Sequence, residues 1–329
     1  MNVAIDVRHG GRWSLLQRSK NDAIWALASL ALAATRPLPL TALRALGRAL
    51  GRTAHALARR ERATALANVA RVFPDLDAQA RRALVRRCFV TLGELLGETV
   101  ALLDARTSPP PLALSAGARA LLDEARAGGR GVVFASAHLG PWERVAASLV
   151  AAGVPLVTLA RESYDPRFSR LYDRLRRAHG VDVVWRGRPG AAARILRTLR
   201  GGGVLGVPMD LRARVASCEV PFLGCAAPTA IGPARIALRT RAAVVVGTVA
   251  PAASGGLEIT ATRIEGADLE PGDAGARELT ARINAELSRR IRALPHAWVW
   301  MHPRWASSPP SPGAAPSPPS PAARASDAV

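Results

Sequence analysis

The stretch at residues 131–143, GVVFASAHLGPWE, limits most strongly what this chain can fold into. Its apolar run VVFASA is too short for a helix and is followed by the chain breakers Gly140 and Pro141, so it predicts a buried strand. Pro141 suits the first position of a helix, and Glu143 then falls in the first turn, beside exposed N–H groups. His138 is therefore expected in a loop at the carboxyl end of a strand, where α/β folds bind ligands.

Strands and helices are predicted to alternate along the rest of the chain. Further candidate strands are residues 154–160, 181–185, 204–208, 243–250 and 257–264. Candidate helices are residues 143–152, 166–178, 191–199, 232–240 and 274–293. This alternation predicts an α/β fold with a mixed, largely parallel sheet flanked by helices. The glycine-rich turn at 201–206 follows a helix and opens a strand, the reverse of a dinucleotide-binding fingerprint.

Segments of different composition suggest three regions. We expect a basic segment with membrane-anchoring helices at 1–60 and a main domain at 61–306. Within that domain, a helical lead-in at 61–111 precedes an α/β part at 112–306. The remaining residues, 307–329, are rich in Pro, Ser and Ala, which predicts a disordered tail.

The N-terminal region contains an apolar run of twelve residues at 23–34. A full membrane span needs roughly 20 residues. The run is consistent with a signal peptide, a soluble core helix, or a short anchor or interfacial helix beside anionic lipid. The long charged stretch before it argues against a signal peptide.

The helix expected within 38–60 has two distinct faces. An apolar stripe consists of Leu40, Leu43, Leu46 and Leu50, and a basic face consists of Arg44, Arg48 and Arg52. Such a pattern fits a helix that packs on a core with a solvated basic face. It fits equally well a basic amphipathic helix that rests on phospholipid.

The charge of the chain points to an anionic partner. Lys and Arg number 45 against 25 Asp and Glu, a net charge of +20, which suits nucleic acid, a phospholipid surface or an acidic carrier protein. Aromatic residues are 4%, which leaves few stacking platforms for single strands, and no zinc-finger or RNP pattern occurs. We therefore expect an anionic membrane surface and no nucleic acid. Cys88, Cys218 and Cys225 match no zinc site, and we expect no metal.

His138 suits general base catalysis, because the unperturbed pKa of histidine lies close to neutral. A carboxylate such as Glu143 would hold the ring in one tautomer and stabilise the imidazolium. Residues five apart on an ideal helix do not share a face, so the loop would have to bring the two together. A loop histidine bonded to the backbone, with Glu143 as an ordinary first-turn carboxylate, explains the spacing at least as well.

Several phrases resemble the lipid A biosynthesis lauroyl/myristoyl acyltransferase family, part of a larger group of acyltransferases with an H-x-x-x-x-D/E motif. His138 and Glu143 match that motif, with Pro141 where relatives often carry Asn. Further phrases are NVARVFP at 68–74, VPFLG at 220–224, TAIGPARIA at 229–237 and HAWVWMHPRW at 296–305. Their shared order along the chain is more specific than any single motif.

The resemblance implies roles for individual residues. It implies catalysis by His138 and Glu143, with no cofactor besides the acyl thioester. The positions that it marks as substrate-binding are Gly140, Arg161, Arg176, Asp210, Phe222 and Thr229. The arginines would hold phosphate, and the segment from Phe222 to Thr229 would form a wall of the acyl or acceptor pocket. By itself, Thr229 is placed to cap the helix at 232–240. Trp298 and Trp300 alternate as on a strand, and core packing explains them most simply.

The implied reaction is transfer of a fatty acyl chain from a thioester of acyl carrier protein or CoA to a hydroxyl of a lipid A precursor. The implied location is the cytoplasmic face of the inner membrane, either peripheral or held by a single N-terminal anchor. One alternative is an acyltransferase for another lipid, such as a phospholipid, ornithine lipid or glycolipid. Another is a non-catalytic protein that binds the membrane surface. A serine hydrolase has no support, since no G-x-S-x-G elbow occurs.

Overall fold

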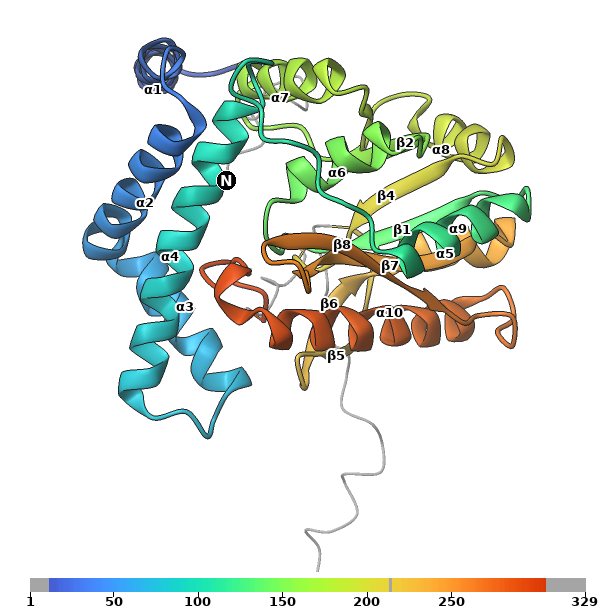
Figure 1. Ribbon diagram of the computed structural model, residues 1–329. Coiled ribbons are helices and arrows are strands. Elements are labelled where there is room, and N and C mark those ends of the chain that lie inside the picture. The colour runs from blue at the N-terminus through green and yellow to red at the C-terminus, as the bar shows by residue number, and fades with distance from the viewer. Residues whose placement is uncertain (1–11, 213–214, 306–329) are drawn as a thin grey trace, which may run out of the picture.

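The computed structural model describes residues 12–212 and 215–305. The tail at 307–329, predicted to be disordered, lies outside the described residues. Figure 1 shows a group of helices, α1 to α4, beside an α/β unit built on a central sheet. The predicted fold class, a mixed and largely parallel sheet flanked by helices, is confirmed.

The N-terminal group consists of α1 (Leu15–Thr35), α2 (Leu40–Leu57), α3 (Arg59–Val72) and α4 (Ala78–Ala101). The apolar run at 23–34 lies within α1. Among the helices that the structure describes, none combines the length and apolar character needed to cross a membrane. Side-chain oxygens of Ser14 and Asp77 accept N–H groups of the first turn and explain where α1 and α4 begin.

Further helices flank the sheet. They are α5 (Ala116–Ala127), α6 (Trp142–Ala151), α7 (Pro166–Ala178), α8 (Ala191–Arg200), α9 (Gly232–Thr240), α10 (Asp273–Ala293) and the 3-10 helix η3 (Pro295–Ala297). Helix α5 was not among the predicted helices, although Ser115 caps its first turn. Pro141 was predicted at the first helical position, whereas α6 begins one residue later and Pro141 is its N-cap.

The six-stranded sheet has the order β3–β2–β4–β1–β7–β8. Its strands are β1 (Val132–Ser136), β2 (Leu156–Ala160), β3 (Asp182–Trp185), β4 (Val204–Pro208), β7 (Ala243–Pro251) and β8 (Leu257–Ile264). Neighbouring strands are parallel except β7 and β8. Ser136 of β1 lies opposite Pro208 of β4. The residues that follow these two strands are therefore brought together at one edge.

A hairpin of β5 (Ser217–Phe222) and β6 (Cys225–Ala230) was not among the predicted strands. Pro221 and Pro228 argue against strands in the sequence, but an isolated two-stranded hairpin has free edges where proline fits. The hairpin turn needs a positive φ at Leu223 and Gly224. Val220 and Phe222 are buried and alternate with exposed residues, as expected of a strand with one packed face.

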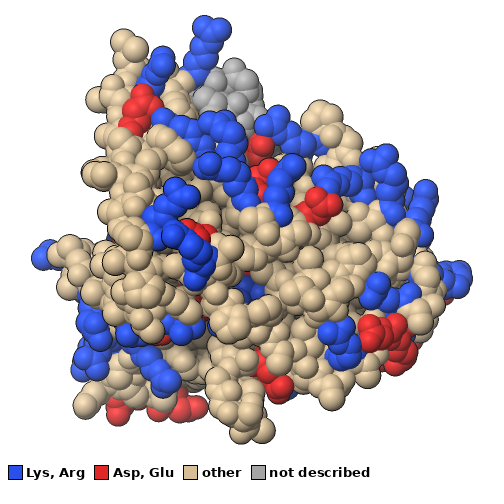
Figure 2. All heavy atoms as spheres, turned by 45° about the horizontal axis from the view of Figure 1, so that its top comes forward, with Lys and Arg blue, Asp and Glu red and all other residues tan. Residues whose placement is uncertain are grey.

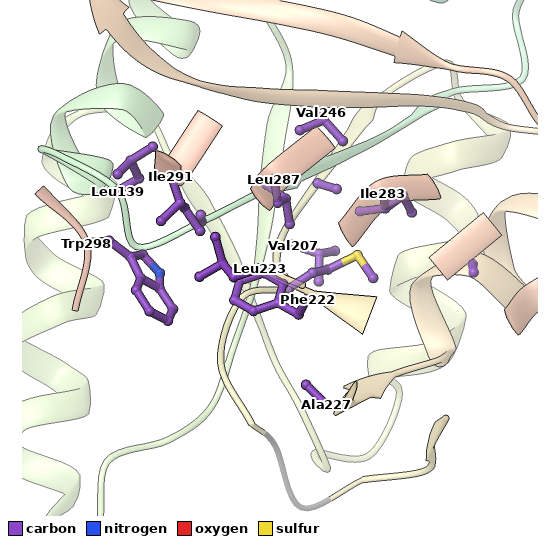
Figure 3. Packing of buried hydrophobic residues seen from close by; sticks show 14 of the residues in the cluster. Leu139, Val207, Phe222, Leu223, Ala227, Val246, Ile283, Leu287, Ile291 and Trp298 are labelled. Atoms are coloured by element: carbon purple, nitrogen blue, oxygen red, sulfur yellow. The ribbon is translucent and has the colours of Figure 1, made fainter. Parts of the chain in front are cut away.

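Side chains of β1 alternate between two apolar cores, one on each face of the sheet. Val132 and Phe134 pack with residues of α5 and α6, whereas Val133 and Ala135 pack with residues of α8, α9 and α10. Figure 3 shows the second core, which joins β4, the hairpin, α10 and the C-terminal segment through Val207, Phe222, Leu287 and Trp298.

Helices α2 and α4 pack glycine against glycine. Gly47 and Gly51 of α2 meet Gly93 and Gly97 of α4, and all four lie where a Cβ atom would collide with the backbone of the other helix. A Cβ at Gly93 would lie 2.2 Å from the carbonyl oxygen of Gly47. No side chain can be accommodated there unless the helices move apart.

We expect Gly93→Ala to lower the free energy of unfolding by about 1–3 kcal/mol, the usual cost of overpacking. Urea unfolding followed by circular dichroism measures this. Gly117→Ala in α5 is the matched control, because a Cβ there has nothing within 4 Å and alanine favours a helix by about 0.5–1 kcal/mol. Equal effects of the two substitutions would contradict the close helix contact.

Candidate active site

The loop between β1 and α6 carries His138 at the carboxyl edge of the sheet, as predicted. Gly140 shapes this loop, since its φ is +67° and a Cβ there would lie 2.5 Å from the Val249 side chain. The N–H of Gly140 donates to the carbonyl of Ala297 at 3.0 Å. The C-terminal segment therefore holds the loop through this hydrogen bond. Only glycine fits at position 140 without displacing Val249.

Asp210 holds the imidazole of His138. The ring Nδ1 lies 2.9 Å from Oδ1 of Asp210, and the backbone N–H of His138 donates to Oδ2 at 2.8 Å. The indole N–H of Trp298 donates to the same Oδ2, also at 2.8 Å. Asp210 and Trp298 are fully buried, whereas the His138 side chain is 26% exposed. The arrangement leaves one edge of the ring open to solvent.

The charge states of this pair follow from their mutual contact. Burial alone would raise the pKa of Asp210, but His138 and the indole of Trp298 lower it below the ordinary value. Asp210 is thus an ionised acceptor, which requires the proton of a neutral imidazole to sit on Nδ1. Burial alone would lower the pKa of His138, but Asp210 and then Glu143 raise it above the ordinary value. Nε2 is left as a strengthened base, and no described residue hydrogen-bonds to it.

Glu143 makes a different contact from the one that the sequence analysis assigned to it. Its two carboxylate oxygens accept from Nε and an Nη of Arg176 at 2.9 and 2.7 Å. Glu143 lies in the first turn of α6 and Arg176 in the last turn of α7, and both are largely buried. Glu143 acts on His138 through space, while the hydrogen bond that orients the ring comes from Asp210.

An apolar pocket lies between α6 and the sheet. Ala137 and Leu139 line it on either side of His138, and Glu143 and Arg176 also contribute to its wall. Further lining residues are Phe134, Trp142, Val145, Leu149, Gly206 and Gly247. Its empty space is about 580 Å³, counted with the part that opens to solvent. An apolar cavity of this kind excludes water and favours a hydrocarbon ligand.

The remaining predicted site residues do not line this pocket. Arg161 follows β2 and is exposed at the carboxyl edge. Phe222 is fully buried in the core beside Trp298, with ring centroids 5.7 Å apart (Figure 3). Thr229 does not cap α9, because it belongs to β6; its hydroxyl accepts from Asn284 and Arg304 at 3.0 and 2.7 Å.

The tryptophans of the C-terminal segment also differ from the prediction. Trp298 forms an isolated antiparallel bridge with Leu139, and Trp300 lies in a turn, so neither belongs to a strand. Both are fully buried, so core packing is confirmed as their main role. The indole of Trp298 has the additional contact with Asp210, which the sequence analysis missed. The only sequence signal was the position of this tryptophan in a phrase shared with the acyltransferases.

Comparison with known families identifies the chain. Residues 13–307 match the family of bacterial lipid A biosynthesis acyltransferases, and the match includes every site residue described above. The chain belongs to this family. The resemblance recognised in the sequence is thereby confirmed. No curated protein matches the acyltransferase.

The loop amides of this acyltransferase are already occupied. The N–H groups of His138, Gly140 and Trp142 donate to Asp210, Ala297 and Gly140, respectively. These three amides are therefore not available to stabilise an oxyanion of a substrate. The residues around His138 instead supply a base, a buried carboxylate and an apolar cavity, a set suited to deprotonating an alcohol beside an acyl chain.

Proposed function

We propose that the protein transfers a fatty acyl chain from an acyl thioester to a hydroxyl of a lipid A precursor at the cytoplasmic face of the inner membrane. The observation that carries this proposal is the imidazole of His138, held at Nδ1 by Asp210, with its chain neighbours Ala137 and Leu139 in the wall of an apolar pocket. The family match supports lipid A-type acyl transfer, and the catalytic roles below are inferred from the geometry.

In the proposed reaction, Nε2 of His138 takes the proton of the acceptor hydroxyl as its oxygen attacks the thioester carbonyl carbon. The tetrahedral intermediate then collapses, the carbon–sulfur bond breaks, and the imidazolium returns the proton to the departing thiolate. Asp210 stabilises the imidazolium between the two steps. Glu143 adds a second negative charge nearby, whose effect on His138 is partly offset by the positive charge of its partner Arg176. No covalent acyl-enzyme is needed.

The apolar pocket is proposed to hold the acyl chain. Its wall at Ala137 and Leu139 adjoins His138, so the thioester would lie at the base while the hydrocarbon runs between α6 and the sheet. Gly206 of β4 lies along this path, and an added Cβ would lie 3.0 Å from Cδ1 of Leu156 and 3.4 Å from Cγ2 of Thr158. Both neighbours also line the pocket. A methyl group at position 206 would therefore narrow the space for the chain.

We expect Gly206→Ala to shift the preference towards shorter acyl donors. One methylene in an apolar pocket is worth about 1–3 kcal/mol, so kcat/KM for the longest accepted chain should fall about tenfold or more relative to the next shorter one. Competition between donors of different length, with products separated by mass spectrometry, measures the shift. Gly117→Ala should leave the preference unchanged. An equal loss of kcat/KM for donors of every chain length would show that the pocket does not hold the acyl chain.

The donor is proposed to be a thioester of acyl carrier protein, with CoA as the alternative. Residues 161–200, which run from the end of β2 through α8, contain eleven arginines and four acidic residues. Figure 2 shows Lys and Arg side chains crowded over this region, which Figure 1 places around α7 and α8. An acidic protein would be attracted to this surface over several ångströms and could contact many of its arginines. The small CoA molecule could contact only a few of them, so the surface favours the carrier protein.

We expect Arg170→Glu together with Arg174→Glu to raise KM for the carrier-protein donor about tenfold or more at low salt. Both side chains are exposed on α7. The CoA donor should be affected little. The matched control is the same pair of charge reversals at Arg59 and Arg60, which are exposed on α3. Equal losses with both donors, or with the control pair, would argue against a carrier-protein surface on α7.

The proposed function is tested by incubating the purified protein with a labelled acyl thioester and a panel of acceptors. A lipid A precursor, a phospholipid, an ornithine lipid and a glycolipid are offered separately, and the products are identified by mass spectrometry. Acylation of the lipid A precursor supports the proposal. Acylation of another acceptor alone would reassign the substrate, and no acylation of any acceptor would favour a binding protein.

A further inference from the structure

Helix α1 buries its polar side and exposes apolar residues, the reverse of a surface helix in a soluble protein. Its most buried residue is Asn21, whose side chain accepts a hydrogen bond from Gln17 at 3.0 Å. Leu27 and Leu30 are 67% and 68% exposed, and Ile24 is 45% exposed. Surface helices of soluble proteins direct apolar residues inwards and polar ones outwards. The leucines of α1 therefore do not stabilise the described fold, although they are costly in water.

Helix α1 is nevertheless held firmly against the α/β unit by its inner side. The guanidinium of Arg167, at the start of α7, lies over the rings of Trp13 and Trp25 at 5.9 and 5.6 Å. It also pairs with Asp22 at 2.7 Å. Trp25 contacts Phe168 edge to face, at 5.3 Å between ring centroids. The polar and aromatic side of α1 thus faces the protein, and its orientation is fixed.

Helix α2 repeats this inversion. Its arginines Arg44 and Arg48 point inwards and pair with Glu98 and Glu94 of α4 at 2.6 and 3.0 Å. Three of its leucines point outwards, since Leu46, Leu50 and Leu57 are 41%, 50% and 75% exposed. Leu43, which belongs to the predicted apolar stripe, is buried. The sequence analysis expected the arginines on the free face, so the structure reverses that expectation. The close glycine contact with α4 and these ion pairs explain why the leucines are left outside.

The exposed apolar residues of the two helices form what we call the outer leucine face. It consists of Ile24, Leu27, Leu30, Leu46, Leu50 and Leu57. In Figure 1 the protein partners of α1 and α2, which are α7 and α4, lie on the same side of both helices, so the outer faces point away from the α/β unit. The same two helices and the turn between them also carry exposed cations, at Lys20, Arg36 and Arg52.

We propose that the outer leucine face docks in the plane of an anionic lipid bilayer. The leucines would enter the boundary between headgroups and acyl chains, and the exposed cations would meet anionic headgroups. The inference rests on the proposed function in one respect, since it states how the enzyme meets a membrane-borne acceptor. A second copy of the chain fits this face less well, because an isologous contact would bring the same cations of both copies together.

The test is co-flotation with lipid vesicles. The full chain should float with vesicles of phosphatidylethanolamine and phosphatidylglycerol, less with phosphatidylcholine alone, and less at high salt. Leu27→Glu combined with Leu30→Glu should reduce the bound fraction about tenfold or more, because each charge at a lipid interface opposes insertion. Leu96→Glu, at a leucine of α4 that is 52% exposed, is the control and should leave flotation unchanged.

Activity separates this inference from the proposed function. With acceptor dispersed in detergent, the Leu27→Glu, Leu30→Glu variant should acylate as fast as the unaltered protein, whereas with acceptor in vesicles it should be slow. Unchanged flotation of that variant would overturn the docking face and leave the proposed function standing. The proposal would also be overturned if the unaltered protein did not bind vesicles and was a dimer by light scattering, while the Leu27→Glu, Leu30→Glu variant was a monomer. That result would assign the face to a second copy of the chain. Inactivity of the unaltered protein in detergent would instead count against the proposed function.

Discussion

Replacing His138 by alanine is expected to lower kcat for acyl transfer by about 10²–10⁴-fold, the usual contribution of a positioned general base. The loss should appear in kcat with little change in KM for either substrate, because the imidazole acts on a proton that moves only in the reaction. A continuous assay of thiol release, with product confirmed by mass spectrometry, gives both constants. Flotation with anionic vesicles should be unaffected.

His138→Asn guards against a folding artefact. The amide nitrogen of asparagine lies as many bonds from the backbone as Nδ1 of histidine, so it can donate to Asp210 and the buried carboxylate is not left without that partner. The variant should unfold near the temperature of the unaltered protein and still lack activity. Full activity in either variant would remove His138 from the mechanism.

Asp210→Asn is expected to be the second most damaging change, with a loss in kcat on the order of 10³-fold. Asparagine keeps the shape of the side chain and can still accept from the indole of Trp298. Its amide can donate to Nδ1 of His138, which would move the ring proton to Nε2 and block the base. The pH dependence of kcat reports on the same contact.

The direction of the pH effect follows from the raised pKa of His138. Only the neutral imidazole is a base, so activity should be lost as the pH falls through this raised pKa. Without the negative charge of Asp210 the pKa of His138 falls, and the acid limb of the residual activity should move to lower pH. Glu143→Gln should cause a smaller loss and a smaller shift, since Glu143 acts only through space. A larger loss in kcat for Glu143→Gln than for Asp210→Asn would indicate that Glu143, and not Asp210, orients the imidazole.

The sequence predicts the main sheet well because its strands carry strong local signals. Each is a short apolar run that ends at a polar residue or a chain breaker, and one of the helices between them, α7, begins at a recognisable cap, Asp165. The hairpin of β5 and β6 was missed because its prolines oppose the strand pattern locally. Its stability comes from packing on α10, which lies more than 40 residues further along the chain.

The site shows the same division between local and distant signals. His138 was predicted from its own strand, loop and helix, and Glu143 from its spacing within one motif. The partner of the imidazole depends instead on strand order, since Asp210 reaches His138 only because β4 lies beside β1 in register. No local pattern specifies that pairing. The direction of the leucines in α1 and α2 was likewise unpredictable, because it is set by contacts with α7 and α4.

The contact between Trp298 and Asp210 has a consequence for when the enzyme becomes active during its synthesis. The ribosome makes His138 first, Asp210 later and Trp298 last, and the segment with Trp298 also supplies the carbonyl of Ala297 that fixes Gly140. A growing chain that has exposed only the first two residues lacks both of these supports. The proposed base, His138, should therefore reach its final arrangement only after translation has passed residue 298.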